Sequence, residues 1–305
     1  MKSNDSPKVS IIIPVYNEAD NIGSLLLEIK ERYPGFELIV VDDGSTDDTV
    51  QVADKAGATV YSHPYNIGNG AAVKTGIRVA TGKIFLFMDA DGQHRPEDIG
   101  RMLSFFPDYD MVVGSRDGKG QASFPRAIGN KVYNWLASYV TKFNVKDLTS
   151  GFRAVQSSIA RSYIYLLPNT YSYPTTITLG VLRDGCSVKY LPIPAQKRRS
   201  GKSRIRLFND GVRFLMIIIK ICTLYSPLRI FLPVSGLMFL LGLIRYLYSY
   251  IMEGRFTNMS ALLFISSVII FMMGLVSEQI CQMRFERRVS DRSAQKYRAD
   301  DENEV

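Results

Sequence analysis

The sequence predicts an α/β fold with a mostly parallel sheet and helices on both faces, followed by a C-terminal hairpin of two transmembrane helices. Short β-branched segments alternate with amphipathic segments in the N-terminal part of the chain, which is typical of parallel strand–helix units. From residue 210 to 282 the sequence is instead mostly apolar. The average composition, with 46% hydrophobic and 22% charged residues, conceals this division.

The N-terminal part is predicted to consist of strands and helices joined by short connections. Residues 9–14 form a β-branched run that ends at Pro14, as expected for a buried strand. Leu25, Leu26 and Ile29 give the helix that follows an apolar stripe. The same patterns predict helices at 17–32, 46–56, 71–80 and 125–141, strands at 37–41, 59–62, 83–88, 111–113 and 188–191, and a basic loop at 198–206.

Two apolar segments near the C-terminus are each long enough to cross a bilayer. Residues 228–252 and 259–277 provide the roughly 20 residues that a spanning helix needs. The short connector between them makes a hairpin, and Arg245 inside the first segment is expected to snorkel or to pair within an oligomer. Two buried helices of a soluble domain are disfavoured because no polar residues alternate with these runs.

These features divide the chain into four predicted parts. They are an α/β domain at 1–206, an interfacial amphipathic segment at 207–227, two transmembrane helices at 228–280 and a charged tail at 281–305. Arg213 and Lys220 would lie on the polar side of the interfacial segment. A buried core helix is the alternative for that segment.

The basic residues of the chain gather beside its apolar part. The net charge is +8, with clusters at 197–206 and at 284–288. Neighbouring membrane spans favour contact with anionic lipid over binding of nucleic acid, and no nucleic-acid module is recognisable. The same clusters flank the outer ends of the hairpin, so the positive-inside rule places both termini in the cytoplasm.

The remaining composition agrees with a cytoplasmic setting for the N-terminal domain. The three cysteines, Cys186, Cys222 and Cys281, are widely spaced and fit a reducing compartment. The N-terminal residues lack the apolar core of a secretory signal. We therefore expect the α/β domain to stay in the cytoplasm.

Four aspartates follow predicted strands and should lie at one edge of the sheet. Asp42 and Asp43 follow one strand, and Asp89 and Asp91 follow another, and ligands bind at this edge of parallel sheets. Two carboxylates separated by one residue can hold one Mg²⁺ or Mn²⁺ ion, and Gln93 can add an amide oxygen. Such a cation assists the departure of a diphosphate. An acidic turn without function is the alternative for an isolated Asp-x-Asp pair.

Four motifs in the order found here resemble those of family 2 glycosyltransferases with the GT-A fold. They are Ile12-Ile13-Pro14-Val15-Tyr16-Asn17-Glu18, Val41-Asp42-Asp43-Gly44-Ser45-Thr46-Asp47, Asp89-Ala90-Asp91-Gly92-Gln93-His94 and Gly114-Ser115-Arg116. The set closely resembles dolichyl-phosphate mannose synthases and bacterial polyprenyl-phosphate glycosyltransferases over residues 8–206. The paired C-terminal spans resemble the bacterial branch.

The resemblance implies a donor site and a metal site at the matching positions. Pro14, Tyr16 and Glu18 would line the nucleotide pocket, and Asp42 would contact the base. The metal and the donor diphosphate would be held by Asp89, Asp91 and Gln93.

The resemblance also implies a set of cationic residues around the phosphates. Arg116 would lie near the acceptor or donor phosphate, and Arg126 and Asn130 match a pair that contacts the lipid phosphate, with Asn130 departing from the usual serine. The basic loop, with Arg198, Ser203 and Arg204, would close over the diphosphate. His63 and His94 are interpreted as structural residues.

The predicted reaction is inverting transfer of a hexose from a UDP- or GDP-sugar to undecaprenyl or dolichyl monophosphate. The second pKa of a phosphate monoester is near 6, so this nucleophile is already ionised, and the lack of an acidic residue between Asn169 and Arg183 fits a route without a base. Transfer to a lipid or protein hydroxyl and a non-catalytic membrane partner are the alternatives. A processive polysaccharide synthase is disfavoured because Trp135, the one tryptophan, lies outside any Gln-x-x-Arg-Trp motif.

Overall fold

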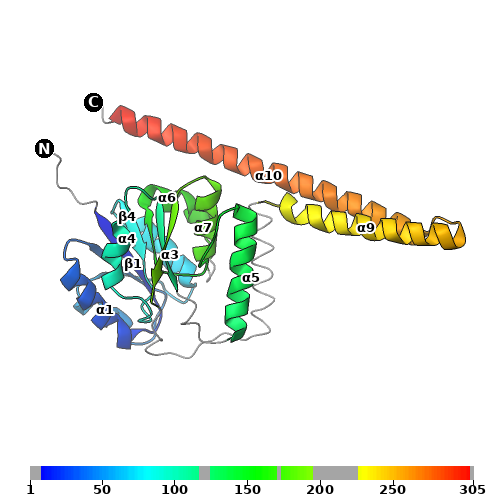
Figure 1. Cartoon of the computed structure of the whole chain (residues 1–305). Coiled ribbons are helices and arrows are strands. Elements are labelled where there is room, and N and C mark those ends of the chain that lie inside the picture. Colours follow the sequence, from blue (N-terminus) through cyan, green and yellow to red (C-terminus); the bar gives the residue numbers. More distant parts are fainter. Residues whose placement is uncertain (1–7, 117–123, 170–172, 195–225, 303–305) are drawn as a thin grey trace. The chain divides into compact units, whose positions relative to one another are not determined.

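The computed structural model describes residues 8–116, 124–169, 173–194 and 226–302. The chain forms two compact units, Met1–Arg206 and Leu207–Val305 (Figure 1). The elements of the first unit are β1 (Val9–Val15), α1 (Ala19–Arg32), β2 (Glu37–Asp42), α2 (Thr49–Lys55), β3 (Thr59–Ser62), α3 (Asn69–Val79), β4 (Ile84–Phe87), α4 (Glu97–Leu103), β5 (Met111–Arg116), α5 (Phe124–Thr141), β6 (Arg153–Gln156), α6 (Ser157–Tyr163), the 3₁₀ helix η2 (Ile164–Leu166), α7 (Tyr173–Arg183) and β7 (Val188–Ile193).

The described strands form a seven-stranded sheet in the order β3-β2-β1-β4-β6-β5-β7. Strands β1, β2, β3 and β4 pair in parallel, as do β5 and β7. Strand β6 runs antiparallel to both of its neighbours, β4 and β5. The predicted mostly parallel sheet is therefore confirmed. The one reversed strand brings its first residue to the edge where β4 and β5 end.

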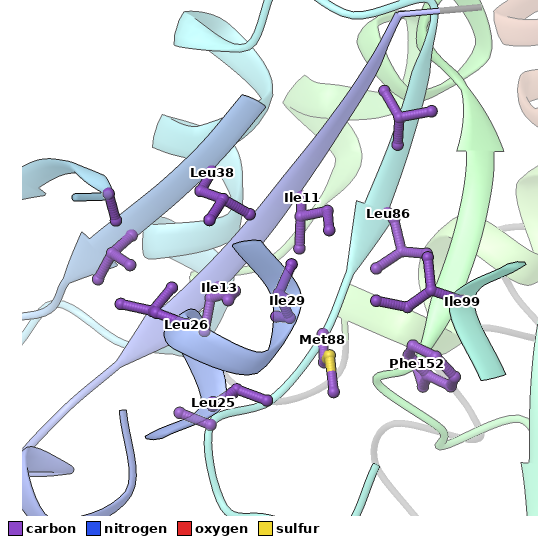
Figure 2. Close-up of a cluster of buried hydrophobic side chains, with 14 of the residues drawn as sticks. Ile11, Ile13, Leu25, Leu26, Ile29, Leu38, Leu86, Met88, Ile99 and Phe152 are labelled. Atoms are coloured by element: carbon purple, nitrogen blue, oxygen red, sulfur yellow. The ribbon is translucent and has the colours of Figure 1, made fainter. Parts of the chain in front are cut away.

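One face of the sheet is covered by α1, α2 and α4. Ile11 and Ile13 of β1 point into a buried cluster with Leu26 and Ile29 of α1 (Figure 2). Ile99 of α4 joins the same cluster. Alternate residues of a strand share a face, so the consecutive isoleucines 11–13 of β1 supply apolar side chains to both faces of the sheet.

The opposite face is covered by α3, α6 and α7. Ile12 of β1 lies against Gly76 of α3, where an added Cβ would collide with the isoleucine side chain. Arg161 of α6 lies over the Phe85 ring, 5.4 Å from its centroid. Tyr173 of α7 contacts the Phe87 ring edge-on, with ring centroids 6.2 Å apart. Helices therefore cover both faces, as the sequence predicted.

Some elements escaped the sequence analysis. Strand β6 and helices α4, α6 and α7 were not predicted, and β5 and β7 extend beyond the predicted strands to Arg116 and Ile193. Strand β6 has only four residues, and it begins with an arginine, which disguises its burial. The predicted loop at 198–206 and the predicted segment at 207–224 lie outside the described residues.

The second unit is a helical hairpin. Helix α9 (Leu228–Glu253) and helix α10 (Asn258–Glu302) are joined by a tight turn at Gly254, whose φ of 62° is left-handed. Two stretches of 26 residues, Leu228–Glu253 and Asn258–Met283, are long and apolar enough to span a membrane. At 1.5 Å per residue each exceeds the roughly 30 Å of a hydrocarbon core. Helix α10 continues well beyond the predicted end of its span.

Small and polar residues join the two helices of the hairpin. Ser235 and Ser267 exchange hydrogen bonds through their hydroxyl groups and main-chain carbonyls, each 3.0 Å long. Gly242 and Gly274 give room for Phe264 and Phe231 of the facing helix. Most large apolar side chains of both helices point outward instead, as expected where lipid replaces a protein core.

Candidate active site

Residues from five strands converge at one edge of the sheet. Strands β1, β2 and β4 end there, and antiparallel β6 begins there, because Arg153 pairs with Phe87 near the end of β4 and with Val113 of β5. Arg116 ends β5 at the same edge. The segment before β6 therefore enters between the strand that precedes Asp89 and the strand that carries Arg116.

The first loop contains the residues predicted to line the nucleotide pocket. Pro14 is buried within β1 and pairs with Val41, while Tyr16 and Glu18 are partly exposed just beyond the strand. The main-chain N–H of Glu18 donates to Thr49 Oγ1 at 2.9 Å, and its carboxylate accepts a hydrogen bond from Asn21 at 2.8 Å. The loop is thus tied to α1 and α2, next to the end of β2.

Asp42 and Asp43 are both buried at the end of β2, but their partners differ. Asp42 accepts hydrogen bonds from the main-chain N–H of Ser45 at 3.1 and 3.2 Å. Asp43 accepts from the main-chain N–H groups of Ile67 and Gly68 and bonds His63 Nδ1 at 2.8 Å. Asp43 therefore holds the loop before α3, whereas Asp42 lies in the turn beside the predicted nucleotide pocket.

Asp89 and Asp91 follow β4 and form the acidic centre of the site. Asp91 is 8% exposed and accepts the main-chain N–H of Gln93 at 3.1 Å. Gly92, between Asp91 and Gln93, has a φ of 74°, a left-handed conformation that bends the chain at this point. Gln93 therefore lies in the same tight turn as Asp91.

The donor set suits a hard divalent cation that also binds substrate. Among the residues that the structure describes, no three His, Cys, Asp or Glu side chains form a cluster able to hold a metal ion by themselves. Mg²⁺ and related cations are commonly held by one or two carboxylates, with substrate phosphates and water completing the shell. Asp89 and Asp91 fit this arrangement.

Gly151 lies directly against the carboxylate of Asp89. A Cβ built on Gly151 would be 2.9 Å from Asp89 Cγ and would also collide with its Oδ2 atom. The glycine thus leaves the space that the carboxylate occupies. Helix α7 supports this segment, since Tyr173 donates its hydroxyl to the Gly151 carbonyl at 3.5 Å.

We expect Gly151→Ala to displace Asp89 and to lower activity about tenfold to a hundredfold, because small misplacements of reacting groups are costly. The overall fold should persist, since Gly151 has no left-handed φ. Steady-state kinetics and thermal unfolding would check this. Gly35→Ala is the control for glycine replacement, because Gly35 is exposed in a turn, has no atom within 4 Å of an added Cβ and has no left-handed φ. Full activity of Gly151→Ala would contradict the tight fit.

His94 is a buried histidine behind the acidic turn. It is 7% exposed, stacks on the Phe152 ring with centroids 4.9 Å apart, and leaves Nδ1 without a hydrogen-bond partner in the described structure. Burial lowers the pKa of His94 to about 4, although Asp91 opposes that shift. A pocket of about 240 Å³ lies beside it, between α1 and the 90–97 loop.

Arg116 and Asp147 form an ion pair next to the acidic centre. Arg116 Nε lies 2.9 Å from Asp147 Oδ2, and Nη2 lies 3.1 Å from Oδ1. Burial alone would lower the pKa of Arg116, but Asp147, together with Asp89 and Asp91, raises the pKa above its ordinary value. The guanidinium therefore stays protonated and positively charged close to the predicted metal ligands.

Arg153 is a fully buried cation beneath the site. It donates to Pro174 O at 2.6 Å, to Thr178 Oγ1 at 2.8 Å and to the Ser150 carbonyl. Burial lowers the pKa of this guanidinium, and Tyr173 and other neighbours partly oppose the shift. Arg153 thereby ties the segment before β6 to the first turn of α7.

The remaining predicted residues are only partly placed. Arg126 and Asn130 lie on α5, four residues apart and hence on one face of the helix. Arg198, Ser203 and Arg204 lie outside the described residues. The structure therefore places Asp42, Asp89, Asp91, Gln93 and Arg116 at the same edge of the sheet as the first loop.

The sequence analysis missed the segment from Asp147 to Arg153. It contains only one acid and one base, so no spacing of like residues pointed to a site. The available signals were an arginine inside an apolar stretch and a Ser-Gly pair before it, which indicate a buried cation and a close backbone approach.

Comparison with known proteins identifies the family. The model of glycosyl transferase family 2 matches residues 10–164, and the GtrB C-terminal hairpin model matches residues 226–283. A dolichyl-phosphate hexose transferase from Haloferax volcanii is 30% identical over 70% of this chain and 93% of its own length. An undecaprenyl-phosphate 4-deoxy-4-formamido-L-arabinose transferase from Pseudomonas aeruginosa is 27% identical over 96% of this chain and 90% of its own length.

A solved structure supports the same fold. Glucosyl-3-phosphoglycerate synthase from Mycobacterium tuberculosis, solved with Mn²⁺, UDP and its product, has a TM-score of 0.58 at 20% identity. The match covers 71% of this chain and 79% of that one. The predicted GT-A fold and membrane hairpin are therefore confirmed, and the chain belongs to glycosyl transferase family 2.

Proposed function

We propose that this glycosyltransferase moves a hexose from a UDP- or GDP-sugar to a polyprenyl monophosphate, with inversion, at the cytoplasmic face of the membrane. The observation that carries the proposal is that one segment contacts both groups: Asp147 is bonded to Arg116, and Gly151 lies against the carboxylate of Asp89. This combination of one firm cation and two carboxylates at a sheet edge suits a reaction between two phosphate-bearing substrates. The names of the two relatives, both polyprenyl-phosphate sugar transferases, support the same acceptor class.

The donor would bind along the edge from β2 to β4. Pro14, Tyr16 and Glu18 would line the nucleotide pocket, with Asp42 near the base. Asp89, Asp91 and Gln93 would hold Mg²⁺ or Mn²⁺, which neutralises the charge that develops on the departing diphosphate. The structural neighbour with bound Mn²⁺ and UDP supports this metal class.

The acceptor would need no general base. A lipid monophosphate is mostly ionised at neutral pH, because its second pKa is near 6. Helix α7, which borders the site, contains no carboxylate between Tyr173 and Arg183. Arg116 would hold and orient a phosphate group, with Arg126, Asn130 and the 198–204 loop as further predicted contacts. Positioning and charge would then supply most of the rate enhancement.

The experiment is a screen of UDP- and GDP-hexoses with the purified full chain, Mn²⁺ or Mg²⁺, and undecaprenyl or dolichyl phosphate. The expected product is a phosphate-linked sugar that mild acid releases. Turnover on another acceptor, with none on any polyprenyl phosphate, would overturn the substrate class. An acid-stable glycoside would favour the alternative, transfer to a lipid or protein hydroxyl.

We further infer the arrangement of the chain at the membrane. The catalytic domain at 1–206 would face the cytoplasm, residues 207–227 would lie in the interface, and the tail at 281–305 would return to the cytoplasm. The basic clusters at both outer ends of the hairpin support this orientation. Labelling of single cysteines introduced near each terminus of the chain in sealed vesicles would test it.

Trp135 offers a direct test of membrane proximity. Its ring is 65% exposed on α5 and stacks on Tyr139, with centroids 6.2 Å apart, and Lys131 is exposed nearby. Aromatic and basic side chains together are typical of helices at the membrane interface. We expect brominated lipids in nanodiscs to quench Trp135, the sole tryptophan of the full chain.

A matched reporter separates this contact from general quenching. Leu27 on α1 is 59% exposed, and α1 and α5 lie on opposite sides of the N-terminal unit (Figure 1). The double variant Trp135→Phe, Leu27→Trp should show little quenching. Equal quenching of the two reporters, or none of Trp135, would contradict contact through α5.

A further inference from the structure

Arg116 is held in place by a residue outside all the motifs identified in the sequence. Asp147 accepts hydrogen bonds from Arg116 Nε at 2.9 Å, from Nη2 at 3.1 Å and from the main-chain N–H at 3.3 Å. Thr149 Oγ1 accepts a further bond from Nη2 at 2.7 Å. A paired carboxylate and guanidinium of this kind fix orientation as well as charge.

These bonds occupy one edge of the guanidinium. They use Nε and Nη2, whereas Nη1 has no partner within the part of the chain that the structure describes. The Arg116 side chain keeps 27% of its surface exposed, compared with 11% for Asp147. The arginine therefore retains donors for a ligand, while the aspartate is enclosed.

The ion pair stabilises the charged forms of both Asp147 and Arg116. Burial raises the pKa of Asp147, but the hydrogen bonds and charge of Arg116 outweigh burial and hold the pKa below its usual range. Both groups therefore stay ionised around neutral pH. The negative charge of Asp147 next to Arg116 also weakens the attraction of Arg116 to Asp89 and Asp91. Without Asp147, Arg116 would pair directly with those carboxylates.

Asp147 is itself fixed by its surroundings. Its Oδ1 accepts the main-chain N–H and the hydroxyl of Thr149, both at 3.1 Å. Asn134 of α5 clamps the segment by donating to Lys146 O at 2.6 Å and accepting from Leu148 N at 3.1 Å. The carboxylate is therefore part of a rigid frame rather than a mobile loop.

We propose that Asp147 is a positioning residue for transfer. It holds the guanidinium of Arg116 by the Nε–Nη2 edge, so that the remaining N–H groups bind a phosphate oxygen of the donor or the acceptor. The inference rests on the proposed function, because it takes binding of a substrate phosphate to be the role of Arg116. Asp147 itself touches no substrate.

The test is a double-mutant cycle with Arg116→Ala, Asp147→Asn and the combined variant. Asp147→Asn keeps the shape but loses the charge and the paired acceptors, so Arg116 turns away or binds Asp89. We expect a fall of about tenfold to a hundredfold in kcat/KM in the wild-type background. In the Arg116→Ala background the same change should cost less than about twofold, because groups that act as a unit are non-additive.

Binding measurements complete the cycle and identify the phosphate. Affinities of all four proteins are measured for UDP and GDP with Mn²⁺, and separately for undecaprenyl phosphate in detergent. Non-additivity for the nucleotides assigns Arg116 to the donor, and non-additivity for the lipid assigns it to the acceptor. Additive effects in turnover and in both binding arms would overturn the proposal, since a merely structural aspartate would act independently of Arg116.

A second aspartate, which is half-buried and hydrogen-bonded elsewhere in the same unit, provides the control variant. Asp110, at the opposite end of β5, accepts Ser187 N at 2.8 Å and the Ser187 hydroxyl at 3.0 Å. Asp110→Asn should lower the thermal midpoint without changing kcat. Failure of wild-type protein to use polyprenyl phosphates would overturn the proposed function alone, because the nucleotide arm of the cycle would still decide the role of Asp147.

Discussion

Replacing Asp91 with alanine is expected to reduce transfer by roughly three orders of magnitude, the scale of several kcal/mol of lost charge stabilisation. Asp91 would lose its place as a metal ligand, and the turn would lose the hydrogen bond from Gln93 N. A diphosphate bound without its cation is a poor leaving group. Titration of Mn²⁺ by electron paramagnetic resonance, with and without UDP or GDP, should show weakened metal binding alongside the lost activity.

The control for Asp91→Ala is Asp54→Ala on the exposed surface of α2. It removes the same charge away from the sheet edge and should leave metal binding and transfer unchanged. Thermal unfolding separates a damaged fold from a damaged site. Normal transfer by Asp91→Ala would remove the basis for a metal at this position.

Replacing Arg153 with leucine is expected to destabilise the N-terminal unit by about 3–5 kcal/mol, because buried polar groups would lose their donors. The carbonyls of Ser150 and Pro174 and the hydroxyl of Thr178 all accept from this fully buried guanidinium. Activity should fall with stability, since the segment that borders Asp89 and Arg116 would loosen.

Chemical unfolding followed by the fluorescence of Trp135 measures this effect on the full chain in nanodiscs. Arg161→Leu is the matched control, because Arg161 donates to the single carbonyl of Ala80 and is exposed. Its cost should stay near 1 kcal/mol, about the value of one ordinary hydrogen bond with partial solvation. Equal losses of unfolding free energy in both variants would show that the buried hydrogen bonds of Arg153 contribute little to stability.

The N-terminal strands illustrate what could be predicted locally. Strand β1 was placed within one residue, and β3 was placed at its observed bounds, because each is a β-branched run bounded by turn residues. Asp89 and Asp91 followed from their position after such a run. The hairpin was predicted because long, mostly apolar segments have few alternatives in water.

Strand β6 illustrates the limit of the same reasoning. Four residues led by Arg153 carry no periodic signal, and their burial depends on acceptors supplied by α7 rather than on neighbours in sequence. The role of Asp147 was equally hidden, since its partner Arg116 is 31 positions away. An isolated aspartate in a predicted turn is normally interpreted as solvent-exposed. Asp147 could therefore be recognised as a buried residue only once its partner Arg116 was located.

The sequence by itself determined the fold class, the acidic centre at Asp89 and Asp91, and the membrane hairpin, because each is encoded by local spacing and composition. Only the tertiary structure decided that β6 enters antiparallel between β4 and β5. That reversal places Asp147 on Arg116 and Gly151 against Asp89. The physical reason is that strand pairing and the burial of Arg153 depend on packing between distant segments, which no local pattern records.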